Sequence, residues 1–79
     1  MKAKIHVTLK HGILDPQGKA IEHALDSLGF TKAGNVRVGK YMEVDLDEQD
    51  KAKAEVEVKS MCEKLLANTI IEEYRYELT

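Results

Sequence analysis

Residues 35–46, Asn-Val-Arg-Val-Gly-Lys-Tyr-Met-Glu-Val-Asp-Leu, decide how the rest of this sequence is interpreted. Apolar and polar side chains alternate along it, a period of two that is typical of an extended strand with one buried face. The buried side would hold Val36, Val38, Met42, Val44 and Leu46. The stretch is about twice the usual strand length of roughly 5–6 residues. We therefore expect a second subunit to cover part of it, unless a bend at Gly39 shortens the strand.

The length of 79 residues predicts one domain over residues 1–79. A chain of this size buries only roughly 60–65% of its unfolded surface, so association with other subunits would add stability. The 14 acidic and 12 basic residues are mixed along the sequence, and there is one Phe and no Trp. Without a basic stripe or aromatic stacking residues, a nucleic-acid-binding role is not expected.

The single Cys62 cannot form an internal disulfide, and no Cys/His spacing indicates a zinc site. No apolar run approaches the roughly 20 residues of a membrane helix, and residues 1–4 do not resemble a signal peptide. We expect a cytoplasmic protein that binds neither nucleic acid nor membrane.

The first half of the chain predicts a strand followed by a helix. Residues 4–9 alternate, with Ile5, Val7 and Leu9 on one face. Asp15 is expected as the N-cap of a helix, with Pro16 in the first helical position, and the helix runs to Leu28. Its apolar stripe consists of Ala20, Ile21, Ala24, Leu25 and Leu28. Glycine in a first turn is unfavourable, so Gly18 indicates that another backbone or subunit approaches closely there.

The second half predicts another helix and another strand. Acidic residues at 47–50 suit a helix N-terminus, and the helical spacing continues to Leu65. Residues 70–78 alternate as a last strand. The expected fold is α+β, a two-layer sandwich with two helices on one face of a small sheet. Its order is β-α-β-α-β with one long central strand, and dimerisation would extend the sheet.

Few side chains indicate chemistry. The three histidines, at 6, 11 and 23, do not cluster and are interpreted as ordinary surface residues. Cys62 lies on the apolar face of the second helix and is expected to be a small buried hydrophobe. Lys40 falls in the apolar row between Val38 and Met42. A bulge at Gly39 would explain this, but it would turn Met42 outward. We therefore keep the register and expect Lys40 to extend to solvent or to meet a carboxylate at an interface.

Several runs together resemble one family. They are Val7–Lys10, Gly12–Ala20, Ala24-Leu25, Leu28–Phe30, Val36–Lys40 and Cys62–Asn68. The Leu14–Gly18 run, Leu-Asp-Pro-Gln-Gly, is the most specific of them. This pattern is similar to the PurS family, the small subunits of phosphoribosylformylglycinamidine (FGAM) synthase. Two residues depart from it, since His11 and Thr69 stand where the family commonly has proline, both in turns.

The resemblance implies a non-catalytic subunit of a complex in de novo purine biosynthesis. That complex converts formylglycinamide ribonucleotide, glutamine and ATP to formylglycinamidine ribonucleotide. The family would dimerise, bridge a glutaminase subunit (PurQ) and a synthetase subunit (PurL), and help ammonia pass between them. This chain would bind no cofactor, because ATP and magnesium belong on the synthetase subunit.

The candidate site residues fall into two groups. Candidates for partner contact are Asp15, Gln17, Gly18, Arg37 and Lys40, with Arg37 and Lys40 pointing to opposite faces. Candidates for the dimer interface are Val38, Met42, Val44 and Leu46. No catalytic or metal-binding set is expected.

Two other functions remain open at this point. Small sheets of this kind often bind metabolites between subunits, so the chain is alternatively a stand-alone dimeric regulatory module. It is alternatively an enzyme whose site His11, Asp15 and Lys40 complete across a dimer. Co-purification with a glutaminase and a synthetase distinguishes the subunit from both.

Overall fold

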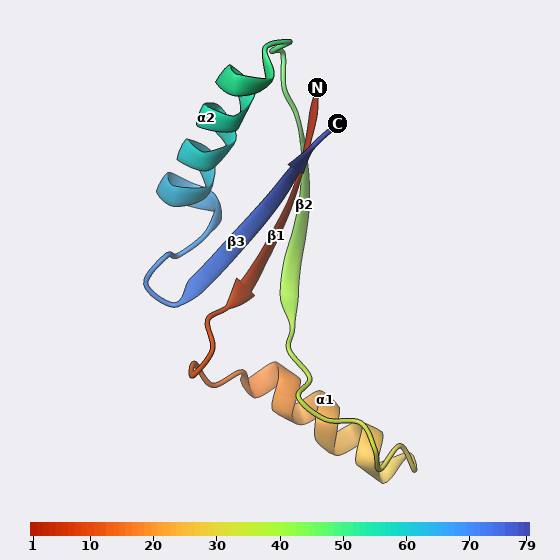
Figure 1. Ribbon diagram of the computed structural model, residues 1–79. Coiled ribbons are helices and arrows are strands. Elements are labelled where there is room, and N and C mark those ends of the chain that lie inside the picture. Colours follow the sequence, from red (N-terminus) through yellow and green to blue (C-terminus); the bar gives the residue numbers. More distant parts are fainter.

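The computed structural model describes residues 1–79 and gives five elements in the expected order (Figure 1). They are β1 (Lys2–Leu9), α1 (Pro16–Ser27), β2 (Gly39–Asp45), α2 (Lys51–Met61) and β3 (Glu72–Leu78). A π-helical turn, Cys62–Leu66, continues α2. The predicted α+β class is confirmed. Neither helix is long and apolar enough to span a membrane.

The three strands form one antiparallel sheet in the order β2-β1-β3. β1 is the middle strand, so β2 is an edge strand and does not have the central place we expected. The predicted register is confirmed: Met42 lies opposite Ile5, and Lys40 lies opposite Val7 in the same unbroken ladder. Pairing continues through Gly39 without a bulge, which leaves Lys40 in the row of apolar side chains.

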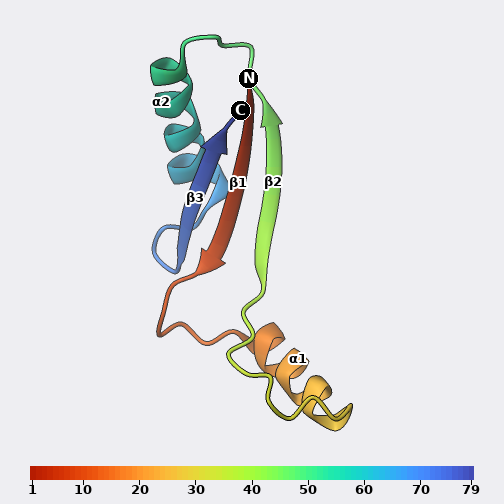
Figure 2. The same cartoon turned by 45° about the vertical axis from the view of Figure 1, so that its right-hand side comes forward.

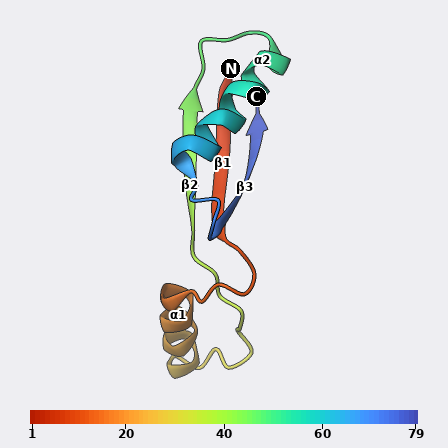
Figure 3. The ribbon, with the colours of Figure 1, turned by 90° about the vertical axis from the view of Figure 1, so that its left-hand side faces the viewer.

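The core lies between β1 and α2 (Figure 3). Ala3, Ile5 and Val7 alternate along β1 and are fully buried, as are Val58 and Cys62 on the facing helix. Cys62 is thus the small buried hydrophobe that its helical spacing predicts. One helix is too narrow to cover three strands, so the inward side chains of the edge strands stay half-buried. They are Met42 and Val44 of β2, Leu46 just after it, and Tyr74, Tyr76 and Leu78 of β3.

The expectation that both helices cover one face of the sheet is wrong for α1 within a single chain. α1 lies beyond the end of the sheet that is opposite to both termini (Figures 1 and 2). The molecule measures 49 × 24 × 14 Å, with a radius of gyration of 16.0 Å. A compact chain of this length has a radius of gyration of about 12 Å. The single chain is therefore an extended body with α1 as an arm.

The prediction of a long strand over residues 35–46 is only partly confirmed. Ladder pairing covers Gly39–Asp45, seven residues, and residues 35–38 continue alone toward α1. The reason is that β1 ends at Leu9 and turns away, so no strand lies beside residues 35–38. The backbone amides of Val36 and Val38 find partners on α1 and on its N-cap.

Two valines on α2 test the core. We expect Val58→Ala to lower the free energy of unfolding by about 2 kcal/mol, because two buried methyl groups are lost and a cavity remains. Val56 is 70% exposed on the same helix and provides the matched control. Val56→Ala should change the free energy of unfolding by less than about 0.5 kcal/mol. Urea denaturation at one fixed protein concentration measures both. Equal effects of the two substitutions would contradict this core.

Candidate functional site

The carboxylate of Asp15 connects α1 to the start of β2. Oδ1 accepts a hydrogen bond from the amide of Gly18 at 2.9 Å, which confirms the predicted N-cap. Oδ2 accepts one from the amide of Val38 at 2.7 Å. Asp15 is only 4% exposed, and these two amides, with help from the nearby Arg37 guanidinium, hold the pKa of Asp15 below its ordinary value.

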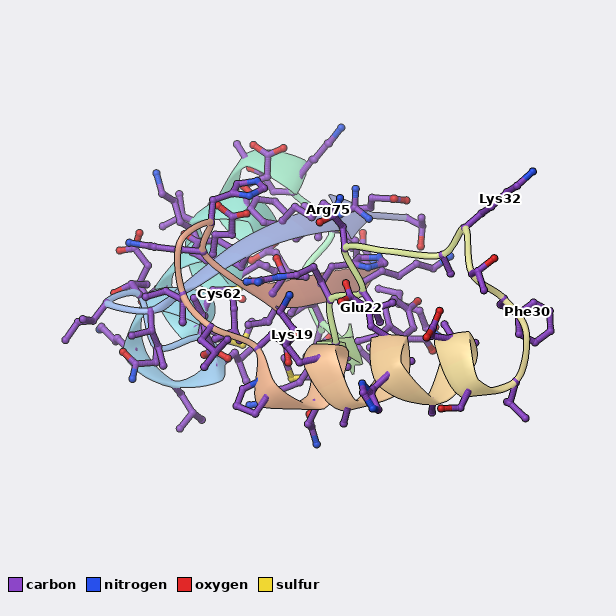
Figure 4. The ribbon with its side chains drawn as sticks, turned by 90° about the horizontal axis from the view of Figure 1, so that it is seen from below. Lys19, Glu22, Phe30, Lys32, Cys62 and Arg75 are labelled. Atoms are coloured by element: carbon purple, nitrogen blue, oxygen red, sulfur yellow. The ribbon has the colours of Figure 1, made fainter.

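A second carboxylate repeats this contact about two turns further along α1. Glu22 Oε1 accepts a hydrogen bond from the amide of Val36 at 2.9 Å, and Lys19 lies 3.6 Å from the other oxygen. The Val36 amide, and then Lys19, lower the pKa of Glu22. Figure 4 shows Lys19 and Glu22 on the arm. The two contacts hold residues 35–38 against one side of α1, and we call this contact the arm junction.

Gly18 permits the close approach that its place in a first helical turn predicts. A Cβ on Gly18 would overlap the carbonyl oxygen of Val36. The neighbouring backbone therefore belongs to the same chain. The left-handed φ of 54° at Asn35 turns the chain into this contact, and asparagine tolerates such a conformation better than most residues.

Arg37 and Lys40 contact different groups within the chain. The Arg37 guanidinium donates to the carbonyl of Lys10 at 3.2 Å, beyond the end of β1. Lys40 Nζ lies 4.0 Å from Glu72 Oε2 of β3, across the sheet. Lys40 thus meets a carboxylate of its own chain, whereas the expectation placed that carboxylate at an interface.

Four of the nine candidate residues line one hollow of about 340 Å³ between the arm and the sheet. Asp15, Gln17, Val38 and Lys40 lie there together with Glu72. Gly18 is buried behind them, and Arg37 lines a separate small hollow beside Glu22. Sequence reasoning missed Glu72, because its proximity to Lys40 follows only from the strand order.

The other face of the sheet is polar and open. Tyr41, His6 and Arg75 form one cross-strand row there, with the rings of Tyr41 and His6 4.8 Å apart. A hollow of about 500 Å³ lies over this row and over Gly39, where there is no side chain to fill it. Sequence reasoning treated His6 as an ordinary surface residue, and nothing in the alternation of β1 distinguishes it.

The dimer-interface candidates share the inner face. Met42, Val44 and Leu46 pack against the core of their own chain while staying half-buried, and Val38 is half-buried at the arm junction. In the alternative of an enzyme using His11, Asp15 and Lys40, the Asp15 carboxylate would have to act while each of its oxygens accepts a backbone amide.

The chain resembles known proteins along its whole length. Residues 2–79 match the family model described as PurS: phosphoribosylformylglycinamidine (FGAM) synthase. The chain belongs to the PurS family. Over 77 residues, 98% of this chain and 90% of the relative, it is 53% identical to the phosphoribosylformylglycinamidine synthase subunit PurS of Bacillus subtilis.

Two solved structures share this fold. Methanocaldococcus jannaschii PurS, described as one of the subunits of formylglycinamide ribonucleotide amidotransferase in the purine biosynthetic pathway, is 38% identical. It matches with a TM-score of 0.85 over 96% of this chain and 92% of its own. A chain of the PurLQS structure from Thermotoga maritima is 33% identical and matches with a TM-score of 0.88 over 96% and 93%. The resemblance to PurS seen in the sequence is thus confirmed.

Gly18→Ala tests the arm junction. Alanine favours a helix over glycine by about 1 kcal/mol, but here its methyl group would displace the backbone at Val36, and overpacking costs about 1–3 kcal/mol. We expect a net loss of thermal stability. The control is Gly34→Ala, where a Cβ meets nothing within 4 Å, and it should be neutral or slightly stabilising. A Gly18→Ala protein as stable as the original would contradict the close approach.

The pH dependence of stability tests Asp15. Because its pKa is lowered in the folded chain, its contribution is complete above the ordinary value of 3.8 and is lost as the pH falls through the lower folded value. Asp15→Asn should lower stability at pH 7 and flatten the acid part of the stability curve, since an amide offers only one acceptor oxygen. Thermal melts from pH 2 to 7 measure this. Parallel curves for the two proteins would refute it.

Proposed function

We propose that this chain is the small, non-catalytic subunit of an FGAM synthase in de novo purine biosynthesis. The observation that carries the proposal is the match to PurS over residues 2–79, together with the similarity to a chain of the T. maritima PurLQS structure. The chain acts in the cytoplasm beside a glutaminase subunit, PurQ, and a synthetase subunit, PurL. ATP and magnesium are bound by PurL.

The reaction explains why such a subunit is useful. Glutamine gives up its side-chain nitrogen as ammonia in one active site, and the amidine forms in another, where ATP activates the substrate. Ammonia released to water is diluted and protonated, so the two sites must be held in a fixed relation. We infer that the chain bridges PurQ and PurL and assists this transfer.

The hollow between the arm and the sheet is the candidate surface for partner contact. Gln17 and the 68%-exposed Lys40 offer a polar amide and a cation at its rim. The Lys40–Glu72 pair is long, at 4.0 Å, and its lysine is largely exposed, so it contributes little to folding and Lys40 can turn to a partner's carboxylate. Asp15 and Gly18 act by positioning the hollow.

The small core supports self-association as part of this function. Only 9 of 79 residues are buried, which is few even for a short domain. The chain therefore works as a dimer or a higher oligomer, whose interface includes Val38, Met42, Val44 and Leu46.

Reconstitution tests the proposal. A PurQ and PurL pair that lacks its own small subunit should gain glutamine-dependent FGAM formation when this chain is added, whereas the chain alone turns over neither glutamine nor ATP. A companion measurement uses ammonia in place of glutamine. Activity with ammonia that needs no added chain would show that the chain serves transfer between the sites. No gain with glutamine would refute the proposal.

Arg37→Ala and Lys40→Ala locate the contact. Lys40→Ala should lower glutamine-dependent activity about tenfold with an unchanged melting temperature, because one charged contact of about 1.4 kcal/mol is lost. Arg37→Ala also loses its own-chain bond to Lys10, so its melting temperature must be measured beside its activity. Lys59→Ala on exposed α2 is the control. Full activity of both variants would exclude this contact surface.

A further inference from the structure

The outer face of the sheet, opposite α2, carries a group of polar side chains without partners. No helix covers this face (Figures 1 and 2). His6 on the middle strand is half-buried and lies between Tyr41 and Arg75 in one cross-strand row. The next row holds Thr8 and Glu73. Among these side chains, only that of Tyr41 makes a hydrogen bond or ion pair within the chain. Arg75 and Glu73 do not pair with each other, so the groups of both are free for a molecule from solution.

These side chains surround the hollow of about 500 Å³ described above. Its floor is Gly39, where a Cβ would come within 2.8 Å of the Val7 carbonyl oxygen and 2.9 Å of the Thr8 methyl group. Only glycine fits there, and no side chain fills the space. Lys40 and Tyr74 also line the hollow, but through their backbone, since their side chains lie on the inner face. Ligand sites are typically about 300–1,000 Å³, so the hollow has room for a small metabolite.

The ring of Tyr41 forms one end of the hollow and is held in place. Its hydroxyl donates a hydrogen bond to Glu43 Oε2 at 2.8 Å, and Lys2 Nζ lies 3.4 Å from Glu43 Oε1. The ring also lies 4.8 Å from the ring of His6, at an angle of 57°. The hydroxyl is thus directed toward Glu43 and away from Gly39. The ring itself, 52% exposed, is left for contact with a ligand.

The hollow offers three kinds of contact. Arg75 carries a planar fork of donors that matches a phosphate or a carboxylate. Glu73 carries only acceptors, so it favours hydroxyl groups and disfavours a second negative charge beside it. The exposed ring of Tyr41 favours a flat aromatic group. A simple anion would leave two of these three contacts unused.

The geometry of the sheet gives the distance that a ligand must span. Gly39 lies opposite Thr8 on one edge strand, and Arg75 lies opposite His6 on the other. Residues two apart on a strand are separated by about 6.7 Å and neighbouring strands by about 4.8 Å. The diagonal from Gly39 to Arg75 is therefore about 12 Å. Three groups in series are needed to fill it.

We propose that this hollow binds a ribonucleoside 5′-monophosphate. The base lies over Gly39 against the ring of Tyr41. The ribose lies over the middle strand, and its hydroxyl groups donate to Glu73. The phosphate accepts hydrogen bonds from Arg75 and His6. All these residues belong to one chain, so the site needs no second subunit, and the inference does not depend on the FGAM synthase assignment.

Titration of the intact ¹⁵N-labelled chain with AMP, without PurQ or PurL, tests the site by NMR. We expect saturable amide shifts confined to residues 6–8, 39–41 and 73–75. Adenosine, ribose 5-phosphate and inorganic phosphate each lack at least one of the three groups, and each should bind at least about tenfold more weakly than AMP. Inorganic phosphate or glutamate that binds as tightly as AMP overturns the proposal. Shifts centred elsewhere, or none up to millimolar AMP, also overturn it.

Arg75→Gln tests the phosphate contact. It should weaken AMP binding at least about tenfold, because a charge-assisted contact is lost, and leave the weaker binding of adenosine unchanged. Lys4→Gln is the matched control, since Lys4 lies on the same face, one row beyond His6 and away from the hollow. It should change the Kd for AMP by less than about threefold.

Both variants should keep the melting temperature of the original protein, because neither cation forms an ion pair within the chain. An equal loss of AMP binding in the two variants would mean that AMP responds only to the charge of the whole face, and would overturn the site. Unchanged AMP binding by Arg75→Gln would overturn it as well.

Discussion

Two hydrogen bonds to one carboxylate determine where α1 lies relative to β2. Asp15 caps α1 through Gly18 and at the same time accepts the amide of Val38, the last residue before β2. A cap that bonded only within the helix would leave α1 free to rotate about its connections. Because the second oxygen is used as well, the direction of the helix is tied to that of β2, and Glu22 fixes it again at Val36.

This constraint determines which surfaces are left for other molecules. With α1 held beyond the sheet, α2 is the only helix over the core, and the inward rows of both edge strands remain half-buried. Apolar side chains of α1 and of the β2 edge stay partly open. The area that the chain does not bury internally is the area available to partners.

The sequence predicts the local structure well and the long-range structure less well. The N-cap at Asp15, the register of Lys40 and the burial of Cys62 follow from neighbours within a few residues. The alternation at Val36 and Val38 suggested a strand, because a period of two shows which way the side chains point. It does not show which groups form hydrogen bonds with the backbone. Likewise the stripe on α1 shows that it packs against something, without showing which chain supplies it. The pairing of Lys40 with Glu72 depends on the strand order, which has no local signal.

The arm junction also affects how binding free energy is used. A flexible arm would lose conformational entropy on docking, which subtracts from the gain of apolar burial. Here Asp15 and Glu22 already order the backbone at residues 35–38. The loss of conformational entropy therefore occurs when the chain folds, and it does not reduce the free energy of binding. The proposed partner-contact hollow lies at the base of the same arm. A change at Lys40 therefore alters one side chain of the hollow, whereas a change at Asp15 or Gly18 moves the arm that forms it.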